Sequence, residues 1–430
     1  MKKYDGKKIL FLGSNAGTVD LIKYARSNGA CVFVADYYSV DKSPAKAIAD
    51  ESLFLSTADL DALEAVVRDN DIDCVYSGIS EFNLIQSMRL SERCGTPFYC
   101  SEHQWASVAK KDLFRKLCEK HFVPCPTTYY VGSSVPSSLV DSLKYPVVVK
   151  PVDGSSSVGV GICGNAHALR NGIGKALSAS SSNKIIVEQF VSGYEFTAHY
   201  TIFKGRASLS CIDNRYPVAV HEGAVTTIPV ARIYPSLFID EYVDKVDSQM
   251  VSLCEDLGIE YGVLFVQGLF DPDAGEFAVF EAGLRSAGEC PFKLIEKVNG
   301  RNYATMILDS MLGCVPPDGE WVDDPYLGGK SCGVVSYVAK HGVVGKIEGL
   351  EKALSSIPGI IDWELRYPVG SETPDTDTLR QLMLRFFMVC DSRGDLADAI
   401  RQINETVEVF DIEGESLVLK FDPARLSAVV

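Results

Sequence analysis

The sequence Tyr145-Pro-Val-Val-Val-Lys-Pro-Val-Asp-Gly-Ser-Ser-Ser-Val-Gly-Val160 joins a β-branched run to a lysine and a loop of small residues. Its valines predict a buried strand that delivers the ammonium of Lys150. The glycines and serines that follow let backbone N–H groups approach an anion closely. This pattern indicates polyphosphate binding, although a flexible hairpin tip beside a surface lysine would look the same. It is not a Walker A loop, because no Gly-Lys-Ser/Thr closes it.

Length and charge limit the classes of protein to consider. The chain has 430 residues, 47% of them hydrophobic, and a net charge of −16. This length suits about three domains, each with its own core. The acidic balance argues against nucleic acid and anionic membranes as partners, but not against ATP, which needs only a locally positive cleft. No apolar run approaches the ~20 residues that span a bilayer.

Cysteine usage indicates a reducing compartment. The thirteen cysteines are scattered and contain no Cys-x-x-Cys pair, which is typical of free thiols. The charged start of the chain leads directly into Ile9–Leu12, an apolar run too short for a signal peptide. We therefore expect a cytoplasmic protein.

Residues 8 to 104 alternate strand and helix patterns, which indicates a parallel, Rossmann-like sheet. The predicted elements are the strands Lys8–Leu12, Cys31–Ala35 and Cys74–Tyr76 and the helices Val19–Asn28 and Leu60–Asp69. Gly13, Gly17 and Asp36 resemble parts of a dinucleotide site, but their spacing is not Gly-x-Gly-x-x-Gly, so a structural turn is favoured. Glu81 ends a loop that follows a strand, where open sheets bind ligands, and is a candidate substrate residue.

A hairpin supplies the most informative pair of polar residues. Its predicted strands are Val263–Leu269 and Phe277–Ala282. Gln267 and Glu281 are equidistant from Ala274 in the turn, so they should face each other across the ladder. Strand alternation then places Gly283 and Arg285 on the same side. An amide, a carboxylate and a guanidinium on one face suit Mg²⁺ and phosphate, whereas a buried polar pair tied to Arg285 is the alternative.

Further candidates lie on the predicted strands and helices around these motifs. Lys111 lies in the first turn of a predicted helix and would otherwise be an ordinary solvated lysine. Glu188 and Glu195 flank a turn between two predicted strands, where a carboxylate can accept from ribose hydroxyls, or where both glutamates are simply exposed. Arg215 lies in a polar, aromatic segment and could clamp a substrate carboxylate, or lie in a surface loop. The six histidines lack metal-ligand spacing, and His199 and His221 are expected to be structural or to line the substrate.

In this order, the candidate residues resemble the ATP-grasp superfamily, which includes carbamoyl phosphate synthase large subunits, biotin carboxylase, D-alanine ligases and L-amino acid ligases. The resemblance implies an α/β fold with an α+β core. It implies a Rossmann-like pre-ATP-grasp domain at 1–104, an ATP-grasp domain at 105–325 and a ligase-like C-terminal domain at 326–430. A small lid subdomain would span about 125–190. The C-terminal likeness rests on Gly345-Lys-Ile-Glu-Gly and Pro358-Gly-Ile-Ile.

The resemblance also implies a role for each candidate residue. The phosphate-binding residues would be Lys111, Lys150 and the loop residues Ser155, Ser156, Ser157 and Gly159. The adenine hinge and the ribose contact would be Glu188, Gln189, Phe190, Val191 and Glu195. The ligands of Mg²⁺ or Mn²⁺ would be Gln267 and Glu281. The catalytic residues would be Lys150 and Arg285.

One position departs from the family pattern. Gly283 stands where the usual Glu-x-Asn-x-Arg has asparagine, which removes a metal ligand. Water or another residue could complete the metal site, catalysis could be weakened, or the opening at Gly283 could make room for substrate.

The expected function is that of an ATP-dependent carboxylate–amine ligase that forms an acyl phosphate on a small carboxylic or amino acid and then an amide bond. Phosphorylation of bicarbonate or carbamate, as in carbamoyl phosphate synthase, is the first alternative. A non-catalytic ATP-binding protein is the second. The expected partners are a small acid, a small amine and a second copy of the chain in a homodimer.

Overall fold

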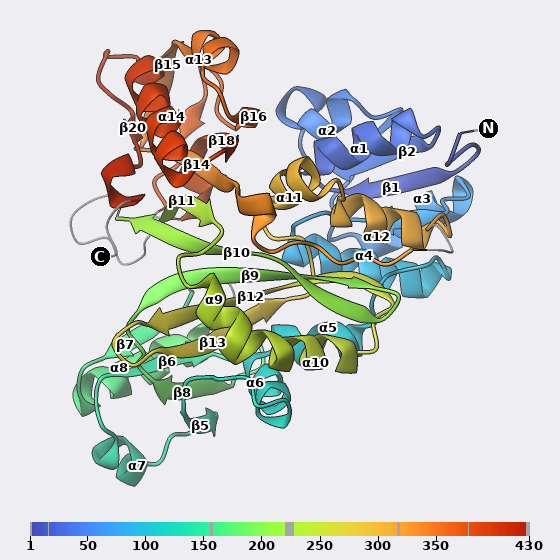
Figure 1. The fold of residues 1–430 in the computed structure, drawn as a ribbon. Helices are drawn as coiled ribbons and strands as arrows, with labels where there is room; N and C mark the ends of the chain where they lie inside the picture. Colours follow the sequence, from blue (N-terminus) through green and yellow to red (C-terminus); the bar gives the residue numbers. More distant parts are fainter. Residues whose placement is uncertain are drawn as a thin grey trace.

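Four β-sheets organise the fold seen in a computed structural model, which describes residues 2–15, 17–154, 158–219, 228–315, 319–376 and 378–426. Figure 1 shows the N-terminal unit in blue, a lid unit in teal at the bottom and the C-terminal elements in red. A large sheet, mainly green and yellow, lies between them. The predicted α/β class, with an antiparallel core, is confirmed.

The N-terminal unit contains a four-stranded parallel sheet in the order β3-β2-β1-β4, as the alternating pattern predicts. Its strands are β1 (Lys8–Leu12), β2 (Cys31–Asp36), β3 (Glu51–Phe54) and β4 (Cys74–Tyr76). Its helices are α1 (Thr18–Ser27), α2 (Pro44–Ala47), α3 (Leu60–Asp69) and α4 (Glu81–Cys94). Ser80 caps α4 by accepting from the backbone N–H of Asn83, and left-handed Gly95 ends the helix.

The glycine turn after β1 is structural. Asp36 is buried and accepts from the backbone N–H groups of Ser14 and Tyr38 at 3.1 and 2.9 Å. Both of its oxygens thus accept hydrogen bonds inside the turn, and their burial supports a structural role for the carboxylate. Gly13 adopts a positive φ of 81° there, a conformation that favours glycine.

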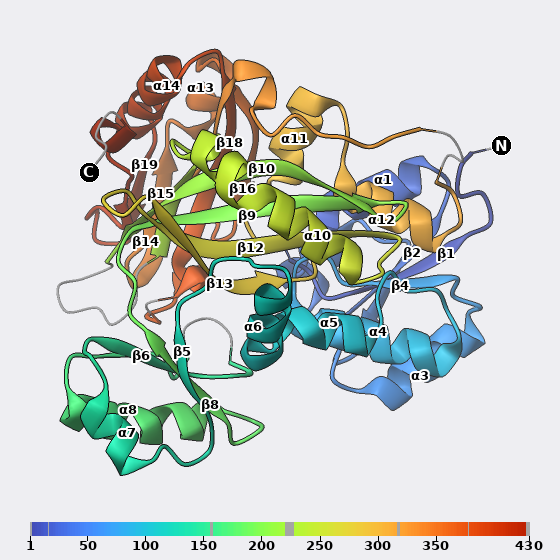
Figure 2. The same ribbon diagram turned by 60° about the horizontal axis from the view of Figure 1, so that its bottom comes forward.

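The lid unit has a small core of its own. Its sheet has the order β5-β8-β6-β7, with strands β5 (Thr128–Gly132), β6 (Val147–Pro151), β7 (Gly161–Cys163) and β8 (Ile185–Gln189). Helices α7 (Ser137–Ser142) and α8 (Ala166–Ala179) cover it. Buried residues such as Val147, Leu169 and Val187 form a cluster separate from the main core. Figure 2 shows this unit projecting from the rest of the molecule.

The central sheet joins residues from two predicted domains. Its order is β13-β12-β9-β10-β11-β14-β18-β16, with β20 beside β14. The first five strands are β13 (Glu276–Gly283), β12 (Tyr261–Asp271), β9 (Tyr194–Phe203), β10 (Arg206–Val218) and β11 (Ile228–Tyr234). The C-terminal segment adds β14 (Ser331–Ala339), β18 (Leu382–Cys390), β16 (Ile360–Leu365) and β20 (Val418–Leu419). The tail therefore extends the core sheet, and the boundaries at 104 and 325 stay predictions.

The remaining elements cover this sheet or form its connections. A three-stranded sheet contains β15 (Gly342–Glu348), β17 (Glu372–Thr373) and β19 (Glu408–Asp411). The other helices of eight or more residues are α5 (Glu102–Ala109), α6 (Lys111–Lys120), α10 (Ser248–Asp256), α11 (Phe292–Asn299), α12 (Tyr303–Met311) and α14 (Arg393–Thr406). Shorter helices are α9 (Ile239–Tyr242) and α13 (Leu350–Ser356). Within the described ranges, no helix combines the length and apolar character needed to cross a membrane.

The predicted pairing of Gln267 with Glu281 is confirmed, but a β-bulge produces it. Near the turn the strands pair Asp271 with Glu276 and then Gly268 with Val279. That register would not place Gln267 opposite Glu281. The register shifts at this point because Phe280 is an extra residue on β13, and the shift brings the two side chains to one face.

We predict that Gly349→Ala destabilises the C-terminal unit. Gly349 precedes α13 with φ 71°, and a Cβ there would lie 1.8 Å from the carbonyl oxygen of Thr406. The strained conformation alone costs about 1–3 kcal/mol, and the contact adds to it. The midpoint of thermal unfolding should fall clearly. Gly174→Ala in α8 is the control, because a Cβ there meets nothing within 4 Å; equal melting of both variants would contradict the prediction.

Candidate nucleotide and metal site

A buried carboxylate shared by two cations lies at the centre of the site. Glu188 on β8 is 1% exposed. Its Oε2 lies 2.7 Å from Nζ of Lys150 on β6, and its Oε1 accepts from Nε of Arg115 on α6 at 2.5 Å. The residues come from two lid strands and one helix outside the lid, so the cluster joins the lid to the body. Arg115 was not among the predicted residues.

Burial and charge act in opposite directions on these groups. Burial tends to raise the pKa of Glu188, but Lys150 and Arg115 outweigh it and hold that pKa below the ordinary glutamate value. Burial lowers the pKa of Lys150, and the attraction of Glu188 offsets this only in part because Arg115 repels the ammonium. The cluster is thus short of negative charge, a condition that an anionic ligand relieves.

Lys111 brings a third cation to the same place. It begins α6, its side chain is buried, and its Nζ donates to the carbonyl of Gly154 at 2.6 Å. The same Nζ lies 4.0 Å from Oε1 of Glu281 on β13. Lys111 therefore lies between the start of the glycine–serine loop and the predicted metal ligands.

The β-bulge ties this cationic cluster to the hairpin. The carbonyl of Phe280, the bulged residue, accepts from Nη2 of Arg115 at 2.9 Å. The ring of Phe280 lies 5.7 Å from Nζ of Lys150, within cation–π range. The residue that sets the register at Glu281 thus also contacts two members of the cluster.

Gln267 and Glu281 have the donor chemistry that Mg²⁺ prefers, since both offer oxygen ligands from directly paired positions. Neither is fully buried, so a ligand can reach them. In the described ranges, no group of three His, Cys, Asp or Glu ligand atoms includes Glu281. The pair is therefore the candidate position for a divalent cation.

Arg285 is held by the N-terminal unit. Its Nε donates to Oε2 of Glu81 at 2.5 Å, and its Nη1 donates to the carbonyl of Ser286 at 3.0 Å. Oε1 of Glu81 accepts from the indole N–H of Trp105 on α5, also at 2.5 Å. Glu81, predicted to face substrate, therefore has both oxygens engaged in holding Arg285 and Trp105.

The suggestion that Gly283 leaves room for substrate is wrong. Phe265 lies directly across the ladder from Gly283. A Cβ on Gly283 would lie 2.5 Å from two atoms of the Phe265 ring. The ring therefore fills the space beside Gly283.

Arg215 and Glu195, assigned to different ligands, pair with each other. Nη1 of Arg215 lies 3.0 Å from Oε2 of Glu195. Arg215 lies on β10, so the polar segment around it is a strand and not a surface loop up to Val218. Burial lowers the pKa of Arg215, and neighbouring Arg232 adds to this.

A second buried network lies farther along the same sheet. Nη1 of Arg232 on β11 lies 2.8 Å from Oδ2 of Asp213 and 3.0 Å from Oε1 of Glu289. Nε2 of His199 lies 3.5 Å from the same Glu289 oxygen. The ligand atoms of His199, Asp213 and Glu289 lie within 4.8 Å of one another, but the guanidinium already supplies the positive charge there. The network anchors the loop that carries Arg285 and Glu289.

The remaining predicted residues belong to the glycine–serine loop, the adenine hinge and the histidines. Ser155, Ser156, Ser157 and His221 lie outside the described residues. Gly159 has φ 75°, and a Cβ there would lie 2.7 Å from Cβ of Ala179. Of the predicted hinge, Gln189 is exposed while Phe190 and Val191 are half-buried.

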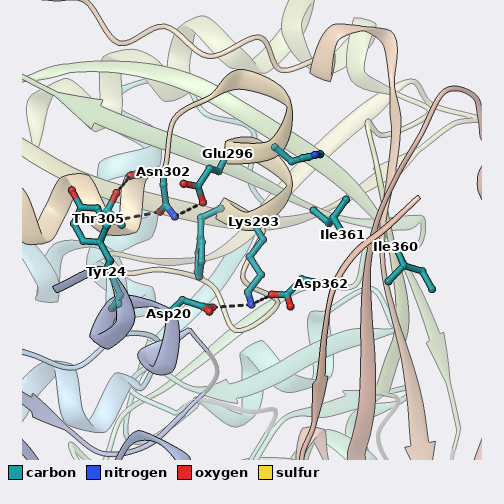
Figure 3. A pocket seen from close by; sticks show the side chains of 12 residues that line it. Asp20, Tyr24, Lys293, Glu296, Asn302, Thr305, Ile360, Ile361 and Asp362 are labelled. Atoms are coloured by element: carbon teal, nitrogen blue, oxygen red, sulfur yellow. Dashed lines mark hydrogen bonds and ion pairs between the residues drawn. The ribbon is translucent and has the colours of Figure 1, made fainter. Parts of the chain in front are cut away.

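A cavity of about 600 Å³ lies apart from these residues, between α1, α11, the start of α12 and β16 (Figure 3). At its wall, Nζ of Lys293 lies 2.8 Å from Oδ2 of Asp20 and also pairs with Asp362. These pairs raise the pKa of Lys293, against the opposing effect of burial. The cavity shares no residue with the predicted nucleotide site.

Sequence comparisons support the motif-based resemblance. Residues 122–206 match the family described as D-ala D-ala ligase C-terminus. The formate-dependent phosphoribosylglycinamide formyltransferase of Prochlorococcus marinus (strain MIT 9303) is 29% identical over 189 residues, which are 43% of this chain and 47% of that protein. The enzyme of the same name from Erythrobacter litoralis (strain HTCC2594) is 29% identical over 197 residues, 44% of this chain and 49% of that protein. The chain thus spans about half the length of these relatives.

Solved structures match nearly the whole fold. The L-amino acid ligase from Bacillus licheniformis has a TM-score of 0.74 at 16% identity, covering 95% of this chain and 99% of that one. Phosphoribosylglycinamide synthetase from Anaerococcus prevotii has a TM-score of 0.72 at 17% identity, covering 94% and 99%. The biotin carboxylase domain of Hydrogenobacter thermophilus 2-oxoglutarate carboxylase has a TM-score of 0.76 at 16% identity, covering 96% and 91%.

These matches define the class as proteins with the ATP-grasp fold. The chain has the ATP-grasp fold, and residues 122–206 match the D-ala D-ala ligase C-terminus family.

We predict that Arg115→Met destabilises the chain, because it removes one of the two cations that compensate buried Glu188. Breaking a buried ion pair costs about 3–5 kcal/mol, so the midpoint of thermal unfolding should fall. The gap between the unfolding midpoints of the variant and wild type should shrink below about pH 4. The pKa of Glu188 is depressed, so its ion pairs stabilise the fold only at pH values where the carboxylate is ionised. Lys116→Met, one residue away and exposed, is the control. A difference that does not change with pH would contradict the role of Glu188.

Proposed function

We propose that the protein is an ATP-dependent ligase that phosphorylates a small carboxylic acid and joins it to an amine. The observation that carries this proposal is the convergence of three buried cations beside the Gln267–Glu281 pair. Lys111, Lys150 and Arg115 face only two carboxylates, so one positive charge is left over. A nucleotide polyphosphate supplies the missing negative charge.

The chain's own residues would act by position and charge. Lys111 and Lys150 hold phosphate oxygens, and Arg285 neutralises charge on the transferred phosphoryl group. Gln267 and Glu281 would hold Mg²⁺, which when bound supplies further charge neutralisation at the phosphates. The adenine and ribose would lie along Glu188–Val191 and Glu195.

The reaction needs no nucleophile from the protein. An oxygen of the substrate carboxylate attacks the γ-phosphorus of ATP, and ADP leaves. The amine then attacks the acyl carbon, phosphate leaves, and the amine proton passes to solvent. Water must be kept away between these steps, because it would hydrolyse the acyl phosphate. The lid, with a core separate from the main core, is the element suited to close over the site.

Bicarbonate is the second candidate for the acid. The structure of the neighbour from Hydrogenobacter thermophilus is described as containing MgADP and bicarbonate. The names of the curated relatives instead contain formate and phosphoribosylglycinamide. The first assay should therefore include bicarbonate, formate, pooled amino acids and pooled amines.

We expect ADP release from Mg-ATP only when an acid and an amine are both present. Lys150→Met should reduce this turnover by at least about 100-fold, the size of effect seen when a group that stabilises transition-state charge is lost. Lys184→Met, an exposed lysine just before β8, is the matched control. Turnover with bicarbonate alone would favour the second candidate. Nucleotide binding with no turnover in any pool would contradict the ligase proposal and favour an ATP-binding protein.

We also expect Glu81→Ala to lower kcat by about 100-fold while leaving the affinity for ATP near wild type. Without Glu81, Arg285 loses its contact at Nε and its orientation, and misplacing a catalytic group by about 1 Å can cost a factor of this size. Glu92→Ala on the exposed side of α4 is the control. If Glu81 instead bound substrate directly, KM for the acid or amine would rise with little change in kcat.

The homodimer and the reducing, cytoplasmic location belong to this proposal as well. A neighbouring structure is described as a domain dimer, and all thirteen cysteines lie in the described ranges as free thiols. Light scattering of the purified chain would test the dimer.

A further inference from the structure

On the hairpin face that carries Gln267 and Glu281, the two adjacent pairs supply no second carboxylate, since Leu269 pairs with Ala278 on one side and Phe265 with Gly283 on the other. Glu281 and Gln267 form a directly paired couple, and the next pair along the same face is Gly283 with Phe265. Neither Gly283 nor Phe265 has a side-chain atom that binds Mg²⁺. Within the described ranges, the His, Cys, Asp and Glu side chains form one group of three possible ligands, His199, Asp213 and Glu289, and it does not include Glu281.

The backbone does not require glycine at position 283. Its φ lies outside the left-handed region that disfavours other residues, and it is part of strand β13. What excludes a side chain is the ring across the ladder, because a Cβ would lie 2.5 Å from Cε1 and Cζ of Phe265. The glycine and the ring are thus a matched pair, and a ligand at position 283 would require the ring to move.

The ring is held in place on more than one side. Phe265 is 8% exposed, and its ring lies 5.0 Å from the guanidinium carbon of Arg285 and 6.5 Å from the ring of His199. A guanidinium over an aromatic face is a favourable cation–π contact. Glu81 fixes the same guanidinium through Nε. Arg285 is therefore positioned by a carboxylate and a ring together.

A purely structural role for the pair is the competing explanation. β13 is the edge strand of the sheet, and aromatic residues often cover glycines in edge strands. That role explains why a ring covers Gly283. It does not explain why Arg285, proposed to contact the phosphoryl group, rests on the same ring.

Resting on the proposed function, we propose that Phe265 and Gly283 restrict this site to a single divalent cation and that Arg285 supplies the second positive charge at the transferred phosphate. One amide and one carboxylate, with phosphate oxygens and water, complete the six ligands that one Mg²⁺ requires. A second dication beside Glu281 would meet repulsion from the first, and the adjacent pairs on this hairpin face offer it no carboxylate. A guanidinium fixed on Phe265 stabilises phosphate charge without any metal ligand.

The test counts Mn²⁺ bound to the full chain in the presence of a non-hydrolysable ATP analogue. Electron paramagnetic resonance measures free Mn²⁺, and calorimetry measures the bound analogue in the same samples. We expect one Mn²⁺ per bound analogue in wild type. Two Mn²⁺ per bound analogue would overturn the inference and leave the proposed function standing.

A pair of variants tests the role of the ring. Phe265→Leu/Gly283→Asn makes room for a ligand and supplies one, so a second Mn²⁺ should bind at least about tenfold more tightly than to wild type. Phe265→Leu alone, which makes room without supplying a ligand, should still bind one. A second ion in the single variant, or none in the double variant with the analogue bound, would overturn the role of this pair. Failure of wild type to bind the analogue at all would overturn both the inference and the proposed function.

Should the double variant not fold, the wild-type count still decides the number of metal ions. Quenching of intrinsic fluorescence by the analogue then tests the second half of the inference. Phe265→Leu should weaken analogue binding less than Arg285→Met, since the first variant loosens the guanidinium and the second removes its charge. If both variants weakened analogue binding equally and wild type bound two Mn²⁺ per analogue, both the single-cation inference and the role of Arg285 would be contradicted.

Discussion

The fold depends on one carboxylate that is buried between two cations. Glu188 lies in the lid, and Arg115 lies on a helix outside it, so their ion pair crosses the junction of two units. Arg115 also bonds to Phe280 in the hairpin. Removing Glu188 from water is unfavourable unless both cations remain. The contacts between the lid, helix α6 and the hairpin therefore all depend on the charge balance around Glu188.

That charge balance explains how binding and lid position can be linked. The three cations of the cluster are balanced by two carboxylates, so one positive charge is left over. The charged groups come from both the lid and the rest of the molecule. An anion bound between them would contact the lid through Lys150 and the body through Lys111. Its free energy of binding is therefore also free energy for holding the two units together.

Local patterns in the sequence predicted much of this arrangement. The ranges of β1, β4 and α3 agree with their hydrophobic periodicity, and the strand that ends in Lys150 and the hairpin of Gln267 and Glu281 were predicted from residue types. The pairing of Gln267 with Glu281 was predicted by simple counting from Ala274, yet it depends on the bulge at Phe280. No sequence pattern marks the bulge here. Counting therefore predicted the correct pair although it assumed a regular register that the strands do not have.

Other features depend on contacts between distant segments, which periodicity does not encode. Arg115 lies four residues after Lys111, hence on the same helix face, and that spacing was the available signal. The Glu81–Arg285 pair spans 204 positions. The filling of Gly283 by Phe265 required the register of two strands. The polar end of the long strand β10 was not predicted as a strand because buried ion pairs replace the apolar alternation there.

The shared central sheet has a consequence for how the protein can change over evolutionary time. Strands β14, β18 and β16, from the C-terminal segment, continue the same hydrogen-bonded ladder that carries Arg215 and Arg232. Loss or exchange of that segment would leave β11 as a bare edge, next to the buried arginine network. The tail is therefore not a module that can be gained or lost independently, and its sequence is constrained by the same sheet that holds the hairpin of Gln267 and Glu281.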